Sequence, residues 1–104
     1  MILYGIKSCD TCRKALKALP QAGFRDVRAE PLSAEEIARF LEVFGDKLLN
    51  RASTTWRGLS EDERADDPAA LLAEYPTLMK RPVIEDGEQV YLGWKVDVQA
   101  ALDV

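Results

Sequence analysis

The chain contains no histidine and only two cysteines, Cys9 and Cys12. A closed zinc site takes four ligands, usually cysteine and histidine, so this chain can complete one only as a dimer, and we expect no bound metal. A disulfide between residues so close together would constrain little of the unfolded chain. Two interpretations of the C-x-x-C pair remain. One is redox or nucleophilic chemistry, which the position of the pair between a strand and a helix favours, and the other is inert packing in the core.

The chain also has no excess of basic residues and no long apolar run. The 104 residues include 14 basic and 18 acidic side chains, which argues against nucleic-acid binding through a broad basic face. No apolar run is long enough to span a bilayer, and no signal-like segment opens the chain, so we expect a cytoplasmic protein without a membrane segment. A hydrophobic content of 47% suffices for one core. We therefore expect a single domain, residues 1–104, and a monomer.

The start of the chain places Cys9 at the junction of a strand and a helix. Apolar residues over 1–5 predict a buried strand, and the spacing over 10–22 predicts an amphipathic helix that Gly23 terminates. Gly5 permits a tight turn between the two elements. Cys9 would then sit at or just before the first helical turn, where its sulfur faces unpaired backbone N–H groups.

This placement makes Cys9 the candidate nucleophile. The N–H groups and the positive end of the helix dipole favour its thiolate, and Ser8 or Asp10 is expected to cap the helix. Cys12 lies close to one turn further along, within reach of Cys9 and less exposed, as a resolving thiol should be. Three cations add positive charge nearby, Lys7, Arg13 and Lys14, and we expect Lys7 and Arg13 to take part in anion binding.

Residues 33–79 predict a helical block between strands. Ser33 and Glu36 form a capping box at the start of its first helix. A polar loop is predicted over 52–57, and a further helix over 68–75. We interpret the block as an insertion into one domain.

The remaining segments predict the rest of a sheet. Alternation over 24–30 predicts a second strand, parallel to the first through a helical crossover. Residues 80–85 and 89–93 predict a hairpin with a two-residue turn at Asp86-Gly87, and 94–104 has helical spacing. The order β-α-β, helices, β-β-α predicts an α/β, thioredoxin-like fold with a mixed four-stranded sheet and an inserted helical subdomain.

This fold suggests two further site residues. In a thioredoxin-like fold the loop before the hairpin lies beside the redox cysteine, so we predict that the Arg81–Pro82 bond is cis, although base rates favour trans. Arg81 would then project near Cys9, where it lowers the thiol pKa or holds an anionic group. Arg51 is placed to reach an anion with its fork, or is a solvated surface arginine.

Three blocks together resemble the arsenate reductase (ArsC)/Spx/YffB family, and the resemblance covers almost the whole chain. YffB-like proteins are the most similar, through the first block and the Thr-Thr-Trp-Arg stretch. The blocks are Tyr4-Gly5-Ile6-Lys7-x-Cys9-Asp10-Thr11, Leu48-Leu49-Asn50-Arg51 with Thr54-Thr55-Trp56-Arg57, and Lys80-Arg81-Pro82-Val83-Ile84.

The resemblance implies roles for individual residues. In arsenate reductases of this type a cysteine attacks arsenate and three arginines bind the oxyanion. Cys9 matches the cysteine, and Arg51 and Arg81 match two arginines. The third is missing, because Trp94 is closest to its expected position and Lys95 is only a neighbouring cation. This weakens arsenate binding specifically and leaves thiol chemistry untouched.

Three functions follow, in order of preference. The first is a glutathione-dependent thiol-disulfide reductase, in which Cys9 attacks a disulfide and Cys12 or glutathione resolves the product. The second is a Spx-like regulator that senses oxidation through Cys9 and Cys12 and binds RNA polymerase through the C-terminal domain of its α subunit. The third is arsenate reduction with glutathione and glutaredoxin. Each uses glutathione or a protein as partner, and none implies a bound metal or prosthetic group.

Overall fold

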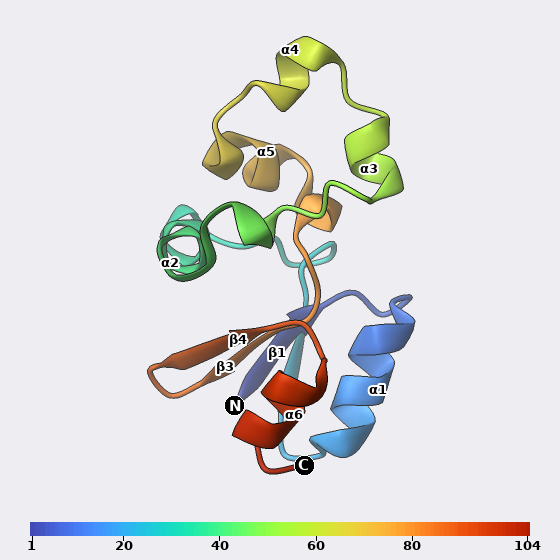
Figure 1. Ribbon diagram of the computed structural model, residues 1–104, viewed down its shortest axis with the longest axis vertical. Coiled ribbons are helices and arrows are strands. Elements are labelled where there is room, and N and C mark those ends of the chain that lie inside the picture. Colours follow the sequence, from blue (N-terminus) through green and yellow to red (C-terminus); the bar gives the residue numbers. More distant parts are fainter. The chain divides into compact units, whose positions relative to one another are not determined.

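The computed structural model describes residues 1–104 and divides the chain into two compact units (Figure 1). The first unit combines residues 1–27 with 81–104, and the second comprises residues 28–80. The two ends of the chain therefore build one unit together, and the segment between them builds the other. The prediction of one domain with an insertion over about 33–79 stays a prediction.

Four strands of the first unit form the mixed sheet that the sequence predicts, in the order β2-β1-β3-β4. β1 runs parallel to β2 and antiparallel to β3, which pairs antiparallel with β4. One helix connects the parallel pair and a second follows the hairpin, so the unit has the thioredoxin-like α/β fold. The elements are β1 (Ile2–Gly5), α1 (Asp10–Ala18), β2 (Gly23–Asp26), β3 (Val83–Asp86), β4 (Gln89–Leu92) and α6 (Val96–Ala101).

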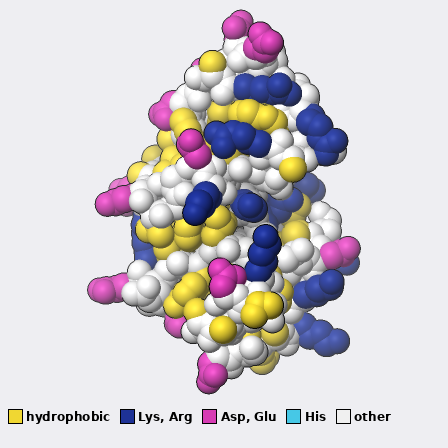
Figure 2. Space-filling model, in the orientation of Figure 1, with side chains coloured by type: hydrophobic (Ala, Val, Ile, Leu, Met, Phe, Trp, Pro, Cys, Tyr) yellow, Lys and Arg dark blue, Asp and Glu magenta, His cyan; other side chains and the backbone are white.

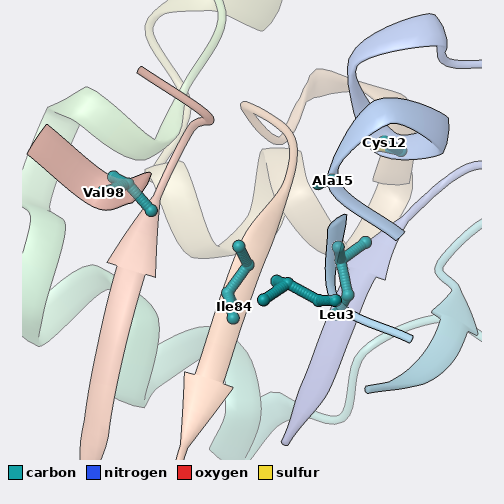
Figure 3. Close-up of a cluster of buried hydrophobic side chains, with 6 residues drawn as sticks. Leu3, Cys12, Ala15, Ile84 and Val98 are labelled. Carbon is teal, nitrogen blue, oxygen red and sulfur yellow. The ribbon is translucent and has the colours of Figure 1, made fainter. Parts of the chain in front are cut away.

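The core of this unit lies between the sheet and its two helices. Leu3 of β1 and Ile84 of β3 are partners in the sheet register, and both are fully buried. Burial of such a side chain contributes about 1.5–3 kcal/mol, so this core holds the first turn of α1 firmly against β1. Four further buried residues complete the cluster (Figure 3): Cys12, Ala15, Leu19 and Val98.

The first helix ends earlier than the spacing over 10–22 predicts. α1 stops at Ala18, and Leu19 has φ −120° and ψ 67°, outside the helical region. The cause is Pro20, because its ring disfavours helical backbone at the residue before it. Gly23 consequently opens β2 and does not terminate the helix.

Two strand boundaries also differ from the prediction. β2 ends at Asp26 and does not reach Glu30, because its partner strand β1 ends at Gly5, opposite Asp26. In the hairpin, Asp86 pairs with Gln89, so the two-residue loop is Gly87-Glu88, one position later than predicted. Gly87 has φ +62°, a conformation that glycine adopts without strain.

The second unit is helical, as predicted, and no helix in either unit is long and apolar enough to cross a membrane. α2 and α5 pack against each other, and Leu49 forms an isolated antiparallel bridge with Met79. The elements are α2 (Ala34–Phe44), the 3-10 turn η1 (Gly45–Leu48), α3 (Thr54–Arg57), α4 (Glu61–Arg64), α5 (Pro68–Glu74) and the 3-10 turn η2 (Pro76–Leu78).

Serine residues cap three helices of this unit, α2, α3 and α4. The capping box at α2 is confirmed, because Ser33 Oγ accepts from the Glu36 N–H at 3.1 Å and the Ser33 N–H donates to Glu36 Oε1 at 2.9 Å. The prediction of a loop over 52–57 was wrong. Ser53 Oγ accepts from the Trp56 N–H at 3.1 Å, which starts the short helix α3.

Candidate active site at the start of α1

Cys9 is the N-cap residue of α1, with φ −84° and ψ 117°. Its N–H donates to the Ile6 carbonyl at 3.1 Å, which closes the turn after β1, and its carbonyl accepts from the Arg13 N–H at 3.0 Å. The predicted position of Cys9 at the start of the helix is therefore confirmed. The expectation that Ser8 or Asp10 caps the helix was wrong, because Cys9 itself occupies the cap position.

The surroundings of the Cys9 sulfur lower the pKa of its thiol below the ordinary value. Partial burial acts in the opposite direction and raises it, but three donors outweigh that effect. They are the Cys12 backbone N–H, which faces the sulfur without making a capping hydrogen bond, the Cys12 thiol, and the Arg81 guanidinium, which also acts through its charge. Donors and a nearby cation stabilise the thiolate, which is the nucleophilic form of cysteine.

Cys12 has the opposite character, although it lies only three residues further along. Its side chain is fully buried in the core cluster. Burial, together with the neighbouring Cys9, raises the pKa of the Cys12 thiol to about 12, against a smaller lowering by the Ile6 N–H. Both cysteines are free thiols, and no group of three or more histidine, cysteine, aspartate or glutamate side chains is arranged to hold a metal ion.

The loop before β3 brings Arg81 to Cys9. The Arg81–Pro82 peptide bond is cis, the isomer predicted from the sequence. Pro82 is buried, and its carbonyl accepts from the Gly93 N–H at 2.8 Å, which ties the loop to the end of β4. The guanidinium of Arg81 donates to the Cys9 sulfur, so two residues far apart in the sequence form one site.

Lys7 lies in the turn after β1, and Arg13 of α1 holds the backbone of that turn. The Arg13 Nε–H donates to the Lys7 carbonyl at 2.9 Å, and Arg13 Nη1 lies 3.4 Å from the carboxylate of Asp10. The Lys7 N–H donates to Asp26 Oδ2 at 3.2 Å at the end of β2. Neither cation is among the groups that lower the pKa of Cys9. Their predicted role in anion binding stays a prediction.

Arg51 belongs to the second unit, and its predicted role beside Cys9 stays a prediction. Its guanidinium carbon lies 5.3 Å from the centre of the Trp56 ring, and Arg64 lies 5.5 Å from the same ring. Figure 2 shows cationic side chains over an apolar patch in the region of α3 and α4. Nη2 of Arg51 is 3.9 Å from Asp46 Oδ2, and the side chain remains 49% exposed.

Trp94 and Lys95 occupy the segment between β4 and α6. Trp94 packs, partly buried, against the core cluster of the first unit, and its carbonyl accepts from Gln99 Nε2 at 2.9 Å. Lys95 is the exposed N-cap residue of α6. Trp94 therefore acts in packing, and it has no charged group that could bind a tetrahedral anion as an arginine guanidinium does.

Sequence reasoning missed the contributions of Gly5 and Ile6. A Cβ atom at Gly5 would overlap the Cys12 sulfur, so this glycine is needed for close packing and not for a positive φ. The Ile6 backbone faces both cysteines, because its carbonyl accepts from the Cys9 N–H and its N–H lies at the Cys12 sulfur. A backbone contact of this kind leaves no signal in the residue type.

The fold and the site define a thioredoxin-like protein with a cysteine at the start of its first helix, where its surroundings favour the thiolate. The chain belongs to the ArsC family, which it matches over residues 4–102. It is 40% identical to an uncharacterized protein of Haemophilus influenzae over 95% of this chain and 96% of that one.

Two further relatives show the range of the family. A solved structure of a YffB protein superposes with a TM-score of 0.88 at 38% identity and covers 96% of both chains. The global transcriptional regulator Spx of Bacillus subtilis is 30% identical over 91% of this chain and 80% of its own length. The predicted resemblance to ArsC, Spx and YffB proteins is thus confirmed.

Proposed function

We propose that this protein is a thiol-disulfide reductase in which Cys9 attacks a disulfide and glutathione supplies the electrons. The observation that carries the proposal is the position of Cys9 at the N-cap of α1 beside Arg81, where polar neighbours and charge lower the pKa of its thiol. A lower pKa increases the fraction of thiolate, which is the attacking form in thiol-disulfide exchange. Membership of the ArsC family supports this chemistry.

The reaction has two exchange steps. The Cys9 thiolate attacks the glutathione sulfur of a mixed disulfide R–S–S–G, forms Cys9–S–S–G and releases the thiolate RS⁻, which takes a proton from water. A second glutathione, as thiolate, then attacks the glutathione sulfur of Cys9–S–S–G, releasing oxidised glutathione and restoring the Cys9 thiolate. In sum, the mixed disulfide R–S–S–G and one free glutathione become the thiol RSH and one oxidised glutathione.

Cations are assigned to hold the glutathione carboxylates. Arg81 is suited to this role because its guanidinium already lies at the Cys9 sulfur, and arginine binds carboxylates through paired hydrogen bonds. The predicted role of Arg51 in anion binding stays a prediction, and its side chain is half-exposed. Lys7 and Arg13 supply additional positive potential at the turn.

The test is glutathione-coupled reduction of a model mixed disulfide. Cys9→Ser should lose turnover, because a serine hydroxyl is not ionised at neutral pH. Ser8→Ala is the matched control, since Ser8 is an exposed neighbour with no role in the proposal, and it should keep wild-type turnover. Equal turnover by wild type and Cys9→Ser would refute the function.

A second candidate function is redox-dependent regulation. It is favoured by the free C-x-x-C pair and by the 30% identity to the regulator Spx. On this alternative, oxidation of Cys9 and Cys12 would control binding to the C-terminal domain of the RNA polymerase α subunit. Pull-down of that domain under oxidising and reducing conditions distinguishes the two functions, because the reductase predicts no redox-dependent association.

A further inference from the structure

The turn between β1 and α1 carries Cys9 at its end (Figure 1). It is closed by the Cys9 N–H, which donates to the Ile6 carbonyl at 3.1 Å, so Lys7 and Ser8 are its two central residues. The backbone groups of central turn residues take no part in the closing hydrogen bond and usually face solvent. At Lys7, however, the N–H and the carbonyl are both bound by side chains of other elements.

Asp26 of β2 binds the N–H of Lys7. The pairing of β1 with β2 ends at Gly5 and Asp26, so Lys7 lies beyond the last pair of the two strands. Its N–H donates to Asp26 Oδ2 at 3.2 Å, and the carboxylate thus takes the place of a strand partner. This hydrogen bond ties the turn to the edge strand of the sheet.

Arg13 of α1 binds the carbonyl of Lys7. The Nε–H of Arg13 donates to that carbonyl at 2.9 Å, and its Nη1 lies 3.4 Å from Asp10 Oδ1, which orients the guanidinium. The backbone N–H of Arg13 also donates to the Cys9 carbonyl at 3.0 Å. One residue of the helix therefore holds the turn on both sides of Ser8.

We propose that Asp26 and Arg13 are positioning residues, which hold the backbone of Lys7 from two sides and thereby keep the Cys9 sulfur at the first turn of α1. The inference deepens the function proposed above, on which it rests for the role of Cys9 as the attacking group. It gives Arg13 a task that depends on the place of its Nε–H and not on its charge.

The effect of a helix start on a thiolate depends on geometry. Its N–H groups stabilise an anion that lies within the first turn and is aligned with them. A turn that is free to move would let the sulfur leave these groups. The sign of the effect of Asp26 is therefore informative, because a carboxylate near the turn should disfavour the thiolate by its charge, whereas its hydrogen bond to Lys7 should favour it through position.

Alkylation of Cys9 by iodoacetamide as a function of pH, followed by mass spectrometry, measures this sign. Asp26→Ala removes the acceptor, so the profile should move to higher pH and the rate at neutral pH should fall roughly twofold to tenfold, the effect of one hydrogen bond. Asp26→Asn keeps an oxygen acceptor without the charge and should not move to higher pH. A profile of Asp26→Ala that is unchanged or moved to lower pH would overturn the role of Asp26.

Two variants of Arg13 separate its hydrogen bond from its charge. Arg13→Gln has an N–H donor at the same number of bonds from the backbone as Nε, without the charge, and should keep the wild-type profile. Arg13→Lys keeps the charge but has a methylene group at that place, so its profile should move to higher pH. The reverse result, a wild-type profile in Arg13→Lys and a shift in Arg13→Gln, would overturn the role and assign the effect to charge.

The inference and the proposed function fail separately, because alkylation requires no glutathione. If glutathione-coupled turnover is absent in the wild type while the profiles differ as expected, the reductase function fails and the positioning role stands. If turnover is present while neither Asp26→Ala nor Arg13→Lys moves the profile, the function stands and the positioning role fails. Thermal melting identifies a variant that does not fold, and the conservative variants Asp26→Asn and Arg13→Gln keep the test decisive in that case.

Discussion

The two longest helices of this protein begin in different ways. α2 starts at Ser33, whose side chain and that of Glu36 satisfy backbone groups of the first turn. α1 starts at Cys9, which makes no side-chain capping hydrogen bond of that geometry, although the Cys12 N–H faces its sulfur. Both N-cap residues have extended backbone. An oxygen at the N-cap position accepts a capping hydrogen bond and stabilises the helix, whereas a sulfur at the same position is in surroundings that favour its thiolate.

Cys9→Ser gives the largest expected effect because it converts the start of α1 into the type seen at α2. Glutathione-coupled turnover should fall below about one hundredth of wild type, whereas the free energy of unfolding should rise by about 0.5–1 kcal/mol. Urea titration at acidic pH measures the gain. Because folding lowers the pKa of Cys9, the stability from its ionisation is present above the unfolded-state pKa and is lost as pH falls through the folded-state pKa.

A combined loss of turnover and gain of stability would support the comparison. A loss of both would contradict it, because the serine would then not act as a cap. Cys9→Ala is the control, since it removes the sulfur without adding a capping oxygen, and its unfolding free energy should lie below that of Cys9→Ser.

Gly5→Ala tests how tightly the start of α1 is packed against β1. The added methyl group would overlap the Cys12 sulfur, so the free energy of unfolding should fall by about 1–3 kcal/mol. Gly58→Ala is the matched control, because its Cβ would find no atom closer than 3.5 Å and its φ is −79°. Urea unfolding at neutral pH measures both. A cost at Gly58 equal to that at Gly5 would refute the packing argument.

Ser33→Ala tests the other side of the comparison. Loss of the cap at α2 should lower the free energy of unfolding by about 1 kcal/mol. Cys9→Ala, in contrast, should lower it by a smaller amount, because Cys9 makes no side-chain cap bond. Both values come from urea titration at acidic pH, where Cys9 is protonated. If the two alanine variants lose the same stability, the two helix starts do not differ as described.

Arg81→Ala gives the smallest expected effect. It separates the contribution of the helix start to the lowered pKa of Cys9 from the contribution of the arginine. Removal of the guanidinium should move the alkylation profile of Cys9 to higher pH and slow alkylation a few-fold at neutral pH. Lys14→Ala removes an exposed cation of α1 that is not among the groups lowering the pKa of Cys9. Its profile should match that of the wild type, and an equal shift in both variants would indicate a general charge effect.

Local patterns predicted much of the fold. The capping box at Ser33, the helix beginning at Pro68 and the strand–helix junction at Cys9 were all found, because each depends on residues within one or two turns. The errors were also local. Pro20 shortened α1, and the Ser53 cap turned a predicted loop into α3. Both signals are present in the sequence, but the helical spacing and the polar composition masked them.

The candidate site was predicted less completely. Cys9 follows from its position before a helix, and the proximity of Arg81 required the fold, since more than the whole helical unit separates the two in the chain. The positive charge that lowers the pKa of Cys9 was expected from Lys7, Arg13 and Lys14 as well. These side chains are exposed and lie in solvent, which screens their charge.

The sequence by itself determined the order of the elements, the position of Cys9 and the cap of α2, because hydrophobic spacing and capping act between near neighbours. Only the tertiary structure decided that Cys12 is enclosed by Gly5 and the core, and that Arg81 donates to Cys9. The physical reason is that burial and charge depend on which distant segments meet. Those two properties give two cysteines three residues apart opposite shifts in pKa.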